Sequence, residues 1–322
     1  MTKQNVLLLG AHGETGGDIL EGLLEDGNFN VSALVQPSSA SKPAVLALAA
    51  RGIPLVIASL SSPIDDLATL LTPFDTLISA IHASSILAQL PLVDAAAKAG
   101  IKRFVPCDFA SVVPPGGILA LRDEKEVVHQ RIWKNHLPYT IIDVGYWHQI
   151  SFPRVPSGRF DYALIFESPE IYGDGEGRTL IGDKRDIGRW VARIIRDGRT
   201  LNRKVVAWSD EASKEQIESA IARADEELKS DPRDLRTWVL RSNAQYSLSK
   251  FIRQDGTLEN AKYLGYLDAR ELYPDFKPIS FEEYVDELLA GGGKRPWETT
   301  NFQALQGLRE EGEERFTLRT EA

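Results

Sequence analysis

The chain has 322 residues, of which 43% are hydrophobic, so it is long and apolar enough for one large domain or two moderate ones. Its net charge of −9 argues against a nucleic-acid partner, its single cysteine, Cys107, excludes a disulfide framework, and its five histidines show no metal-ligand spacing, so no metal is expected. We expect a cytoplasmic protein without a membrane span, since no leader precedes the first apolar run and no apolar run is long enough to cross a bilayer.

The first apolar run, residues 5–9, is typical of the buried first strand of a parallel sheet. Three glycines follow it in a Gly-x-x-Gly-x-x-Gly pattern, ahead of a helical segment at 17–26. Glycine lets a ligand approach the backbone, and the free N–H groups of the helix would face a pyrophosphate. The alternative is an ordinary strand–turn–helix corner. The spacing favours a short-chain-type Rossmann protein and predicts cofactor binding by Gly10, His12, Gly13, Thr15 and Gly16.

Strands and helical segments alternate through about residue 150. This alternation is typical of βαβ units, whose right-handed crossovers place helices on both faces of a parallel sheet. Five further strands are predicted over residues 30–35, 54–57, 76–80, 103–106 and 139–144. Helices are predicted over 42–51, 64–71, 84–99 and 123–135, with Gly27 and Gly100 at helix C-termini.

After residue 150 the pattern loosens, although a helix is predicted over 186–196, a strand over 204–208 and a last helix over 281–289. An acidic helix is predicted over 213–229, with Ser213 and Gln216 placed as a capping box. The predicted fold class is α/β, a doubly wound parallel sheet with a smaller C-terminal α+β region. We divide the chain into a dinucleotide-binding domain (1–150), a substrate-binding region (151–290), whose strands can rejoin the sheet, and a charged extension (291–322).

The residues after the second strand decide between the two nicotinamide cofactors, because an acidic side chain there binds ribose hydroxyls and a basic one accommodates a 2′-phosphate. Residues 35–42 contain neither a carboxylate nor an arginine. Gln36, Ser38, Ser39 and Lys42 can hold a phosphate through hydrogen bonds and one charge, although a polar surface loop is the alternative. The sequence therefore favours NADP(H) over NAD(H).

The sequence resembles the NmrA-like branch of atypical short-chain reductases, in particular the isoflavone, pinoresinol–lariciresinol and phenylcoumaran benzylic ether reductases. The resemblance covers residues 5 to about 290 and includes the glycine spacing and the segments 75–80, 102–109, 137–140, 172–175, 186–188, 199–202, 272–275 and 281–284. It implies NADP(H) and an aromatic or polyketide-like small molecule of secondary metabolism, and it leaves room for a homodimer. Gln36 departs from the family, which usually has arginine there, as do Cys107, Asp108 and Ala110, where Ser, Glu and Gly are usual.

In these reductases a lysine on the helix before the Pro-Tyr-Thr strand acts as general acid/base and helps to bind the nicotinamide ribose. Lys125, 13 residues before Pro138, matches that position, so the resemblance implies that it binds cofactor and is catalytic. On a helix Lys125 would share one face with Val128, His129 and Ile132. The alternative is that residues 122–126 form a charge cluster on a solvated helix.

Ligands of open α/β sheets lie beyond the carboxyl ends of the strands. Cofactor contacts are therefore predicted for Ala80 and for His82, which is also placed to order the backbone. Substrate contacts are predicted for Asp108, Phe109, Tyr146, Trp147 and His148. The alternative is that the aromatic residues only pack the second half of the chain onto the sheet. We expect Cys107 to be a packing residue, and His129 and His136 to lie at the surface.

The Tyr-x-x-x-Lys pair of ordinary short-chain reductases is missing from the helix that carries Lys125, since no tyrosine precedes Tyr139. Two later matches, Tyr246 with Lys250 and Tyr273 with Lys277, are interpreted as coincidences because they lie outside the dinucleotide-binding half. The sequence as a whole predicts an NADPH-dependent reductase that transfers a hydride to its substrate. A cofactor-sensing regulator and a non-redox enzyme on the same fold are the alternatives.

Overall fold

The structure is a computed structural model that describes residues 3–151, 162–163, 177–213 and 245–296. Its main sheet has the strand order β3-β2-β1-β4-β5, and every neighbouring pair is parallel. The strands are β1 (Gln4–Leu9), β2 (Phe29–Val35), β3 (Leu55–Ile57), β4 (Thr76–Ser79) and β5 (Arg103–Val105). Because both faces of such a sheet are covered, its central strands are apolar on both sides, as predicted.

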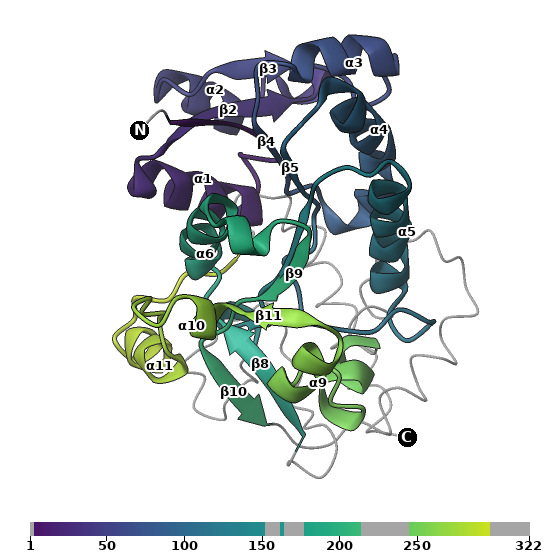
Figure 1. Cartoon of the computed structure of the whole chain (residues 1–322). Helices are drawn as coiled ribbons and strands as arrows, with labels where there is room; N and C mark the ends of the chain where they lie inside the picture. Colours follow the sequence, from purple (N-terminus) through teal and green to yellow (C-terminus); the bar gives the residue numbers. More distant parts are fainter. Residues whose placement is uncertain (1–2, 152–161, 164–176, 214–244, 297–322) are drawn as a thin grey trace, which may run out of the picture.

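Helices cover the two faces of this sheet as separate groups (Figure 1). They are α1 (Glu14–Asp26), α2 (Pro43–Ala50), α3 (Ile64–Leu71), α4 (Leu90–Ala99), α5 (Ala120–Lys134) and α6 (Asp186–Arg196). Val6 and Leu8 of β1 face a core shared with α1, α2 and α6. Leu7 and Leu9 point to the opposite face and join a core with α3, α4 and α5. The doubly wound arrangement predicted from the sequence is therefore confirmed.

Strands from the second half of the chain continue this sheet. β6 (Thr140–Asp143), β9 (Arg203–Val206) and β11 (Tyr266–Asp268) pair in parallel in the order β11-β9-β6. A parallel bridge between Phe104 and Tyr139 connects them to β5. Both sides of the predicted division at residue 150 thus contribute strands to the sheet, and as a division into folding units it stays a prediction.

A glycine in α1 and a glycine in α6 let these two helices, one from each half of the chain, pack closely together. A Cβ on Gly22 of α1 would lie 2.1 Å from the carbonyl carbon of Gly188 in α6, and a Cβ on Gly188 would lie 1.9 Å from the oxygen of Asp18. The two helices therefore touch backbone to backbone, side by side in Figure 1. Lys184, just before α6, adds an ion pair with Asp18 at 2.8 Å.

A smaller sheet lies beyond the carboxyl end of β6. It has the order β10-β8-β7 and contains β7 (Tyr146–Trp147), β8 (Arg178–Gly182) and β10 (Asp210–Ser213), with β10 antiparallel to β8. Around it lie a π-helical segment (Leu248–Ile252), α9 (Leu258–Tyr263), α10 (Ala269–Leu272) and α11 (Phe281–Leu289). Ser280 and Glu283 form a capping box at the start of α11.

Most predicted elements match the structure within a few residues, and the helices at 64–71, 186–196 and 281–289 match at both ends. The predicted helix over 84–99 is wrong in its first half, where a 3₁₀ segment (Ala83–Gln89) precedes α4. Pro91 explains the change, because proline lacks the N–H that a longer helix would need and fits only its first turn. Ser213 ends β10, and the rest of the predicted helix at 213–229 lies outside the described residues, as do residues 164–176 and 297–322.

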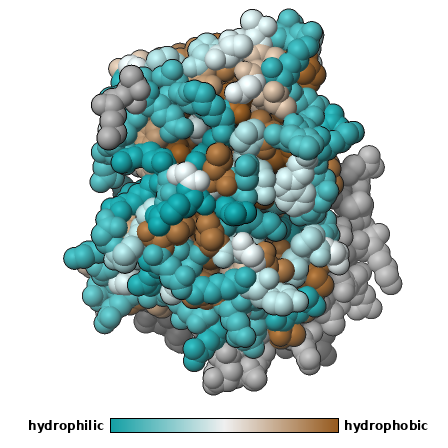
Figure 2. Space-filling view, in the orientation of Figure 1, coloured by the Kyte–Doolittle hydropathy of each residue, from teal (hydrophilic) through white to brown (hydrophobic). Residues whose placement is uncertain are grey.

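The surface is mostly hydrophilic on the face seen in Figure 2, where hydrophobic residues appear only in separate patches. Among the residues that the structure describes, none of the helices has the length and apolar character required to cross a bilayer.

Candidate active site

The loop between β1 and α1 has no room for a side chain at two of its glycine positions. A Cβ on Gly10, whose φ is +88°, would lie 2.3 Å from the oxygen of Ala80, and one on Gly16 would lie 2.0 Å from the oxygen of Gly10. Gly13 caps α1 without a side-chain hydrogen bond, so no capping side chain satisfies the first N–H groups of this helix, which begins just after the carboxyl end of β1. This bare cradle fits a pyrophosphate, and the contacts of its residues with cofactor, that of Thr15 included, stay predictions.

Ala80 lies beside this loop, because its N–H donates to the oxygen of Leu9 at 2.9 Å. Ala80 therefore lies next to the glycine loop, and its contact with cofactor stays a prediction. His82, two residues on, accepts a hydrogen bond at Nδ1 from the N–H of Ser84 and caps the 3₁₀ segment that follows. Ordering of the backbone, one of the two roles predicted for His82, is thus observed.

The loop after β2 brings a positive charge close to the cradle. Gln36 and Ser38 lie in a short 3₁₀ turn region at the end of β2. Lys42 is the N-cap residue of α2, and its side chain is exposed and makes no capping hydrogen bond. Burial lowers the pKa of His12, and the nearby Lys42 ammonium lowers it further. The Nδ1 atom of His12 is buried and has no hydrogen-bond partner in the described part of the chain. A polar group of a ligand can therefore form a hydrogen bond with this nitrogen atom of His12.

Lys125 points inward from α5, as the resemblance implies. Its side chain is buried and Nζ donates a hydrogen bond to the backbone oxygen of Asp108, beyond the end of β5. Arg122 is buried as well, so the interpretation of residues 122–126 as a solvated charge cluster is wrong for these two cations. Lys125 thus reaches the carboxyl edge of the sheet, where ligands of this fold class lie.

The carboxylate of Asp108 is enclosed in an ion-pair network, contrary to its predicted contact with substrate. It accepts from Nε2 of His129 at 2.9 Å and from Nη1 of Arg122 at 3.3 Å. Burial opposes ionisation of Asp108, but His129 and Arg122 outweigh it and hold the pKa of the carboxyl well below its usual range. Asp108 therefore serves the site through its backbone oxygen, which fixes Lys125.

His129 is fully buried, so its expected surface position is wrong. Burial opposes its charge, but the Asp108 carboxylate outweighs burial and raises the pKa of His129. The network continues from Arg122 to Asp143 at 3.2 Å and to the hydroxyl of Tyr266 at 2.8 Å. Burial raises the pKa of Asp143 despite the Arg122 charge. Hydrogen bonds and ion pairs of this network therefore link β6, α5, β11 and the loop after β5 close to Lys125.

Two other predicted substrate residues lie in the core. Phe109 is buried in the core shared with α1 and α6. His148 is fully buried, bonds Ser209 at 3.0 Å and lies near the rings of Phe281 and Tyr284. Burial lowers the pKa of His148 to about 4, so its ring is neutral near pH 7. The packing interpretation describes these two residues, because their observed contacts are with the core and with neighbouring side chains.

Cys107 and the two remaining predicted aromatic residues also lie near the carboxyl ends of the strands. The Cys107 thiol donates to the oxygen of Ile81 at 3.2 Å, and burial raises its pKa to about 11, which agrees with a packing residue. Trp147 packs against the core. Tyr146 contacts two residues whose Tyr-x-x-x-Lys spacing we interpreted as a coincidence. These are Tyr246 and Lys250, which the fold brings to the end of β6; their Tyr-x-x-x-Lys spacing was the only signal for them.

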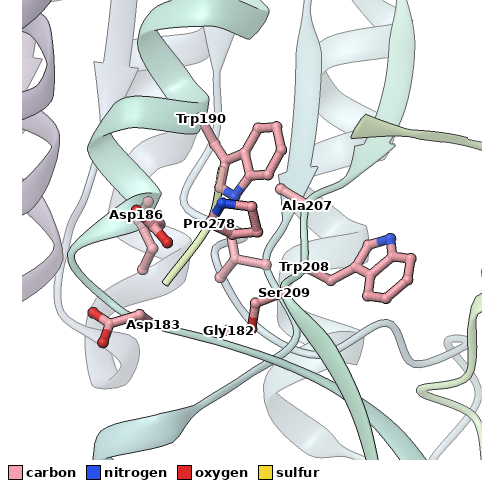
Figure 3. A pocket seen from close by; sticks show the side chains of 10 residues that line it. Gly182, Asp183, Asp186, Trp190, Ala207, Trp208, Ser209 and Pro278 are labelled. Carbon is pink, nitrogen blue, oxygen red and sulfur yellow. The ribbon is translucent and has the colours of Figure 1, made fainter. Parts of the chain in front are cut away.

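A separate small pocket lies where β6, β8 and β9 end beside the start of α6. Figure 3 shows Asp183 and Asp186 on the α6 side of this pocket and Trp208 on the other side. Both carboxylates already have partners: Asp183 binds Arg185 at 2.8 Å, and Asp186 accepts the N–H of Ile279 at 2.6 Å. The glycine loop and Lys125 do not line this pocket.

A doubly wound sheet with a glycine-rich loop after its first strand defines a Rossmann-type protein of the dinucleotide-binding class. The model of the NmrA-like family matches residues 2–285, and the chain belongs to this family. It is 39% identical to asnovolin J 5′,6′-dehydrogenase nvfM of Aspergillus novofumigatus over 89% of this chain and 96% of that protein. It is 25% identical to a probable pinoresinol-lariciresinol reductase of Arabidopsis thaliana over 89% and 98% of the two chains.

Solved structures agree on the fold. A structure from a study of pinoresinol-lariciresinol and phenylcoumaran benzylic ether reductases has a TM-score of 0.73 at 23% identity, and the match covers 89% of this chain and all of that one (100%). The complex of leucoanthocyanidin reductase of Vitis vinifera with NADPH has a TM-score of 0.71 at 21% identity, over 89% and 99% of the two chains.

Proposed function

We propose that this protein is an NADP(H)-dependent oxidoreductase that moves a hydride between the nicotinamide and a carbon atom of an aromatic or polyketide-like small molecule of secondary metabolism. The observation that carries the proposal is that a bare glycine cradle and a buried lysine, Lys125, both lie at the carboxyl edge of the sheet. The relatives support the reaction class, since they are named dehydrogenases and reductases. The fungal dehydrogenase supports the substrate class.

The cradle would hold the pyrophosphate through the N–H groups that begin α1, with His12 and Thr15 at its rim. Gln36, Ser38 and Lys42 would hold the 2′-phosphate of NADP(H) by hydrogen bonds and one charge. The solved complex of leucoanthocyanidin reductase with NADPH supports this choice of cofactor. When bound, the cofactor supplies or accepts the hydride.

Lys125 has two tasks in this proposal. Its ammonium, held by the backbone oxygen of Asp108, would donate a hydrogen bond to the nicotinamide ribose and pass a proton to or from the substrate. The Asp108–His129–Arg122 network beneath it keeps that oxygen in place. Such preorganisation is what positions a general acid for reaction.

The test measures the absorbance of the reduced cofactor after the purified protein is mixed with each of a panel of aromatic substrates, pinoresinol among them. NADPH and NADH are compared in parallel. Substrate-dependent loss of NADPH absorbance supports the proposal, and Lys125→Ala should lower the rate by about a hundredfold or more, the usual contribution of a general acid. Binding of NADP⁺ and NADPH with different affinities and without turnover would indicate a cofactor-sensing regulator instead, and equal affinities without turnover would weaken the proposal. Turnover without net cofactor consumption would indicate a non-redox enzyme.

A further inference from the structure

Both ring nitrogens of the buried His129 face carboxylate oxygens. Nε2 lies 2.9 Å from an oxygen of Asp108, and Nδ1 lies 3.2 Å from an oxygen of Glu126. A neutral ring has only one N–H, so it would turn a lone pair toward one of these carboxylates, whereas the imidazolium donates to both. Asp108 stays ionised because Arg122 also donates to it. The hydrogen bond from His129 lowers the pKa of Glu126. The geometry therefore fits a buried imidazolium.

Residues 106–109, the Asp108 turn, have a strained backbone. The N–H of Asp108 donates to the oxygen of Pro106 at 2.9 Å, and the next residue, Phe109, has a φ of +26°. A residue other than glycine keeps a positive φ only where its surroundings hold it, because its Cβ crowds the backbone there. The N–H of Phe109 bonds an oxygen of β6, and the Asp108 carboxylate bonds His129 and Arg122 of α5. These contacts hold the turn in its strained form.

The same turn provides the hydrogen-bond acceptor of Lys125. The Lys125 ammonium donates to the backbone oxygen of Asp108, while His129, one helical turn further along α5, binds the carboxylate of the same residue. If His129 loses its proton, one of its nitrogens turns a lone pair toward a carboxylate and that hydrogen bond is lost. The strained turn is then less firmly held, and the oxygen that fixes Lys125 can shift with it.

The charge of His129 depends on groups from several elements. Burial opposes the charge, but Asp108 of the loop after β5 outweighs burial and raises the pKa of His129. On its own helix, Glu126 favours the charged ring and Arg122 opposes it. Titratable groups of the neighbouring elements are paired with α5: Asp143 of β6 and Tyr266 of β11 with Arg122, and Asp94 of α4 with Arg131. The 3₁₀ segment that also packs on α5, residues 83–89, contains no charged side chain.

We propose that His129 is a positioning residue: its doubly protonated ring holds the Asp108 turn, and through the oxygen of that turn it holds the Lys125 ammonium in place. This inference rests on the proposed function, which gives Lys125 its tasks toward the cofactor and the proton. It adds a residue that acts on the reaction through Lys125. The hold is complete in mild acid and is lost as the pH rises through the folded-state pKa of His129.

The test measures how fast acetic anhydride acetylates Lys125 in the protein without cofactor, over a range from about pH 6 to about pH 10. Mass spectrometry of peptides gives this rate relative to that of Lys277, which is exposed, so the general effect of pH on amine reactivity cancels. In wild type the ratio should be low in mild acid and rise about fivefold or more as His129 loses its proton, because a charge-assisted hydrogen bond is lost.

Substitutions separate the charge of His129 from its packing. His129→Arg is charged at every pH, so the ratio should stay low throughout, whereas His129→Gln is never charged and should give a high ratio throughout. Glu126→Gln removes one of the two carboxylates and should move the rise to lower pH. His136→Gln, at an exposed position just after α5, is the matched control and should follow wild type.

Equal ratios for His129→Gln and wild type over the whole pH range would overturn the inference. Where that variant does not fold, NMR of the wild-type ring decides, since a His129 nitrogen without its proton at about pH 6 overturns it equally. Calorimetric titration with NADPH tests the proposed function separately: His129→Gln should weaken binding about threefold or more if Lys125 binds the ribose. Failure of NADPH to bind wild type would contradict the proposed function, and the acetylation ratios would still decide what holds Lys125.

Discussion

At the scale of single residues, the glycine loop gives a sharp prediction. Gly16→Ala should weaken NADPH binding about tenfold or more, because the new Cβ would lie 2.0 Å from the backbone oxygen of Gly10 and the cradle must move. Gly17→Ala is the matched control, since its Cβ would lie 4.0 Å from the nearest atom, the oxygen of Ala11. Calorimetric titration with NADPH checks both variants. Equal affinity of Gly16→Ala and wild type would contradict the proposed pyrophosphate site.

Lys42 gives a second prediction at this scale. Lys42→Ala should weaken NADPH binding about tenfold and leave NADH binding nearly unchanged, because a charge-assisted contact to the 2′-phosphate is lost. The same change should raise the pKa of His12, which the Lys42 ammonium now lowers. NMR titration of His12 without cofactor measures that shift independently. If NADPH and NADH lose affinity equally, Lys42 does not select the phosphorylated cofactor.

Single residues also show where sequence reasoning stops. Lys125 was predictable because a helical pattern and a family motif fix its place within one element. The burial of His129 was not, since it depends on Asp108, which lies 21 residues away and on another element. Tyr246 and Lys250 meet Tyr146 across about a hundred residues of chain, so their motif had no visible context. A buried polar residue is intelligible only with its partner.

At the scale of elements, the contact of α1 with α6 supports a prediction about how the halves of the chain adhere. Gly188→Ala should destabilise the protein by about 1–3 kcal/mol, the usual cost of overpacking, because its Cβ would lie 1.9 Å from the oxygen of Asp18. Urea unfolding measures the difference, with Gly198→Ala as control, since a Cβ there meets nothing within 4 Å. An unchanged unfolding midpoint for Gly188→Ala would show that the helices do not need this close approach.

The strands show which elements can be predicted from a sequence. β1 and β4 were predictable because runs of buried apolar residues are bounded by glycine or polar turns. β11 has only three residues, Tyr266 to Asp268, too few for any periodicity, and it joins the sheet through pairing with β9. The start of α4 could have been predicted from Pro91, but the helical pattern before it does not reveal the local break at Ser85.

At the scale of the whole molecule, the two buried histidines respond to pH with opposite signs. His129 has a raised pKa, so its pairing with Asp108 stabilises the fold fully below the unfolded-state pKa and is lost as the pH rises through the folded-state value. His148 has a lowered pKa, about 4, so the unfolded chain binds its proton more readily. Its contribution is present above the unfolded-state pKa and declines as the pH falls toward 4.

His148 should therefore dominate the loss of stability in mild acid. Linkage with an unfolded-state pKa of 6.5 and a folded-state value of about 4 predicts a loss of about 2 kcal/mol between about pH 7 and about pH 5. His148→Gln can keep a polar contact with Ser209 and has no proton to bind, so most of this pH dependence should vanish. His136→Asn, at an exposed position with φ +50°, is the control and should keep the wild-type slope. Urea unfolding at both pH values measures the slopes; equal slopes for His148→Gln and wild type would mean that another group governs acid stability.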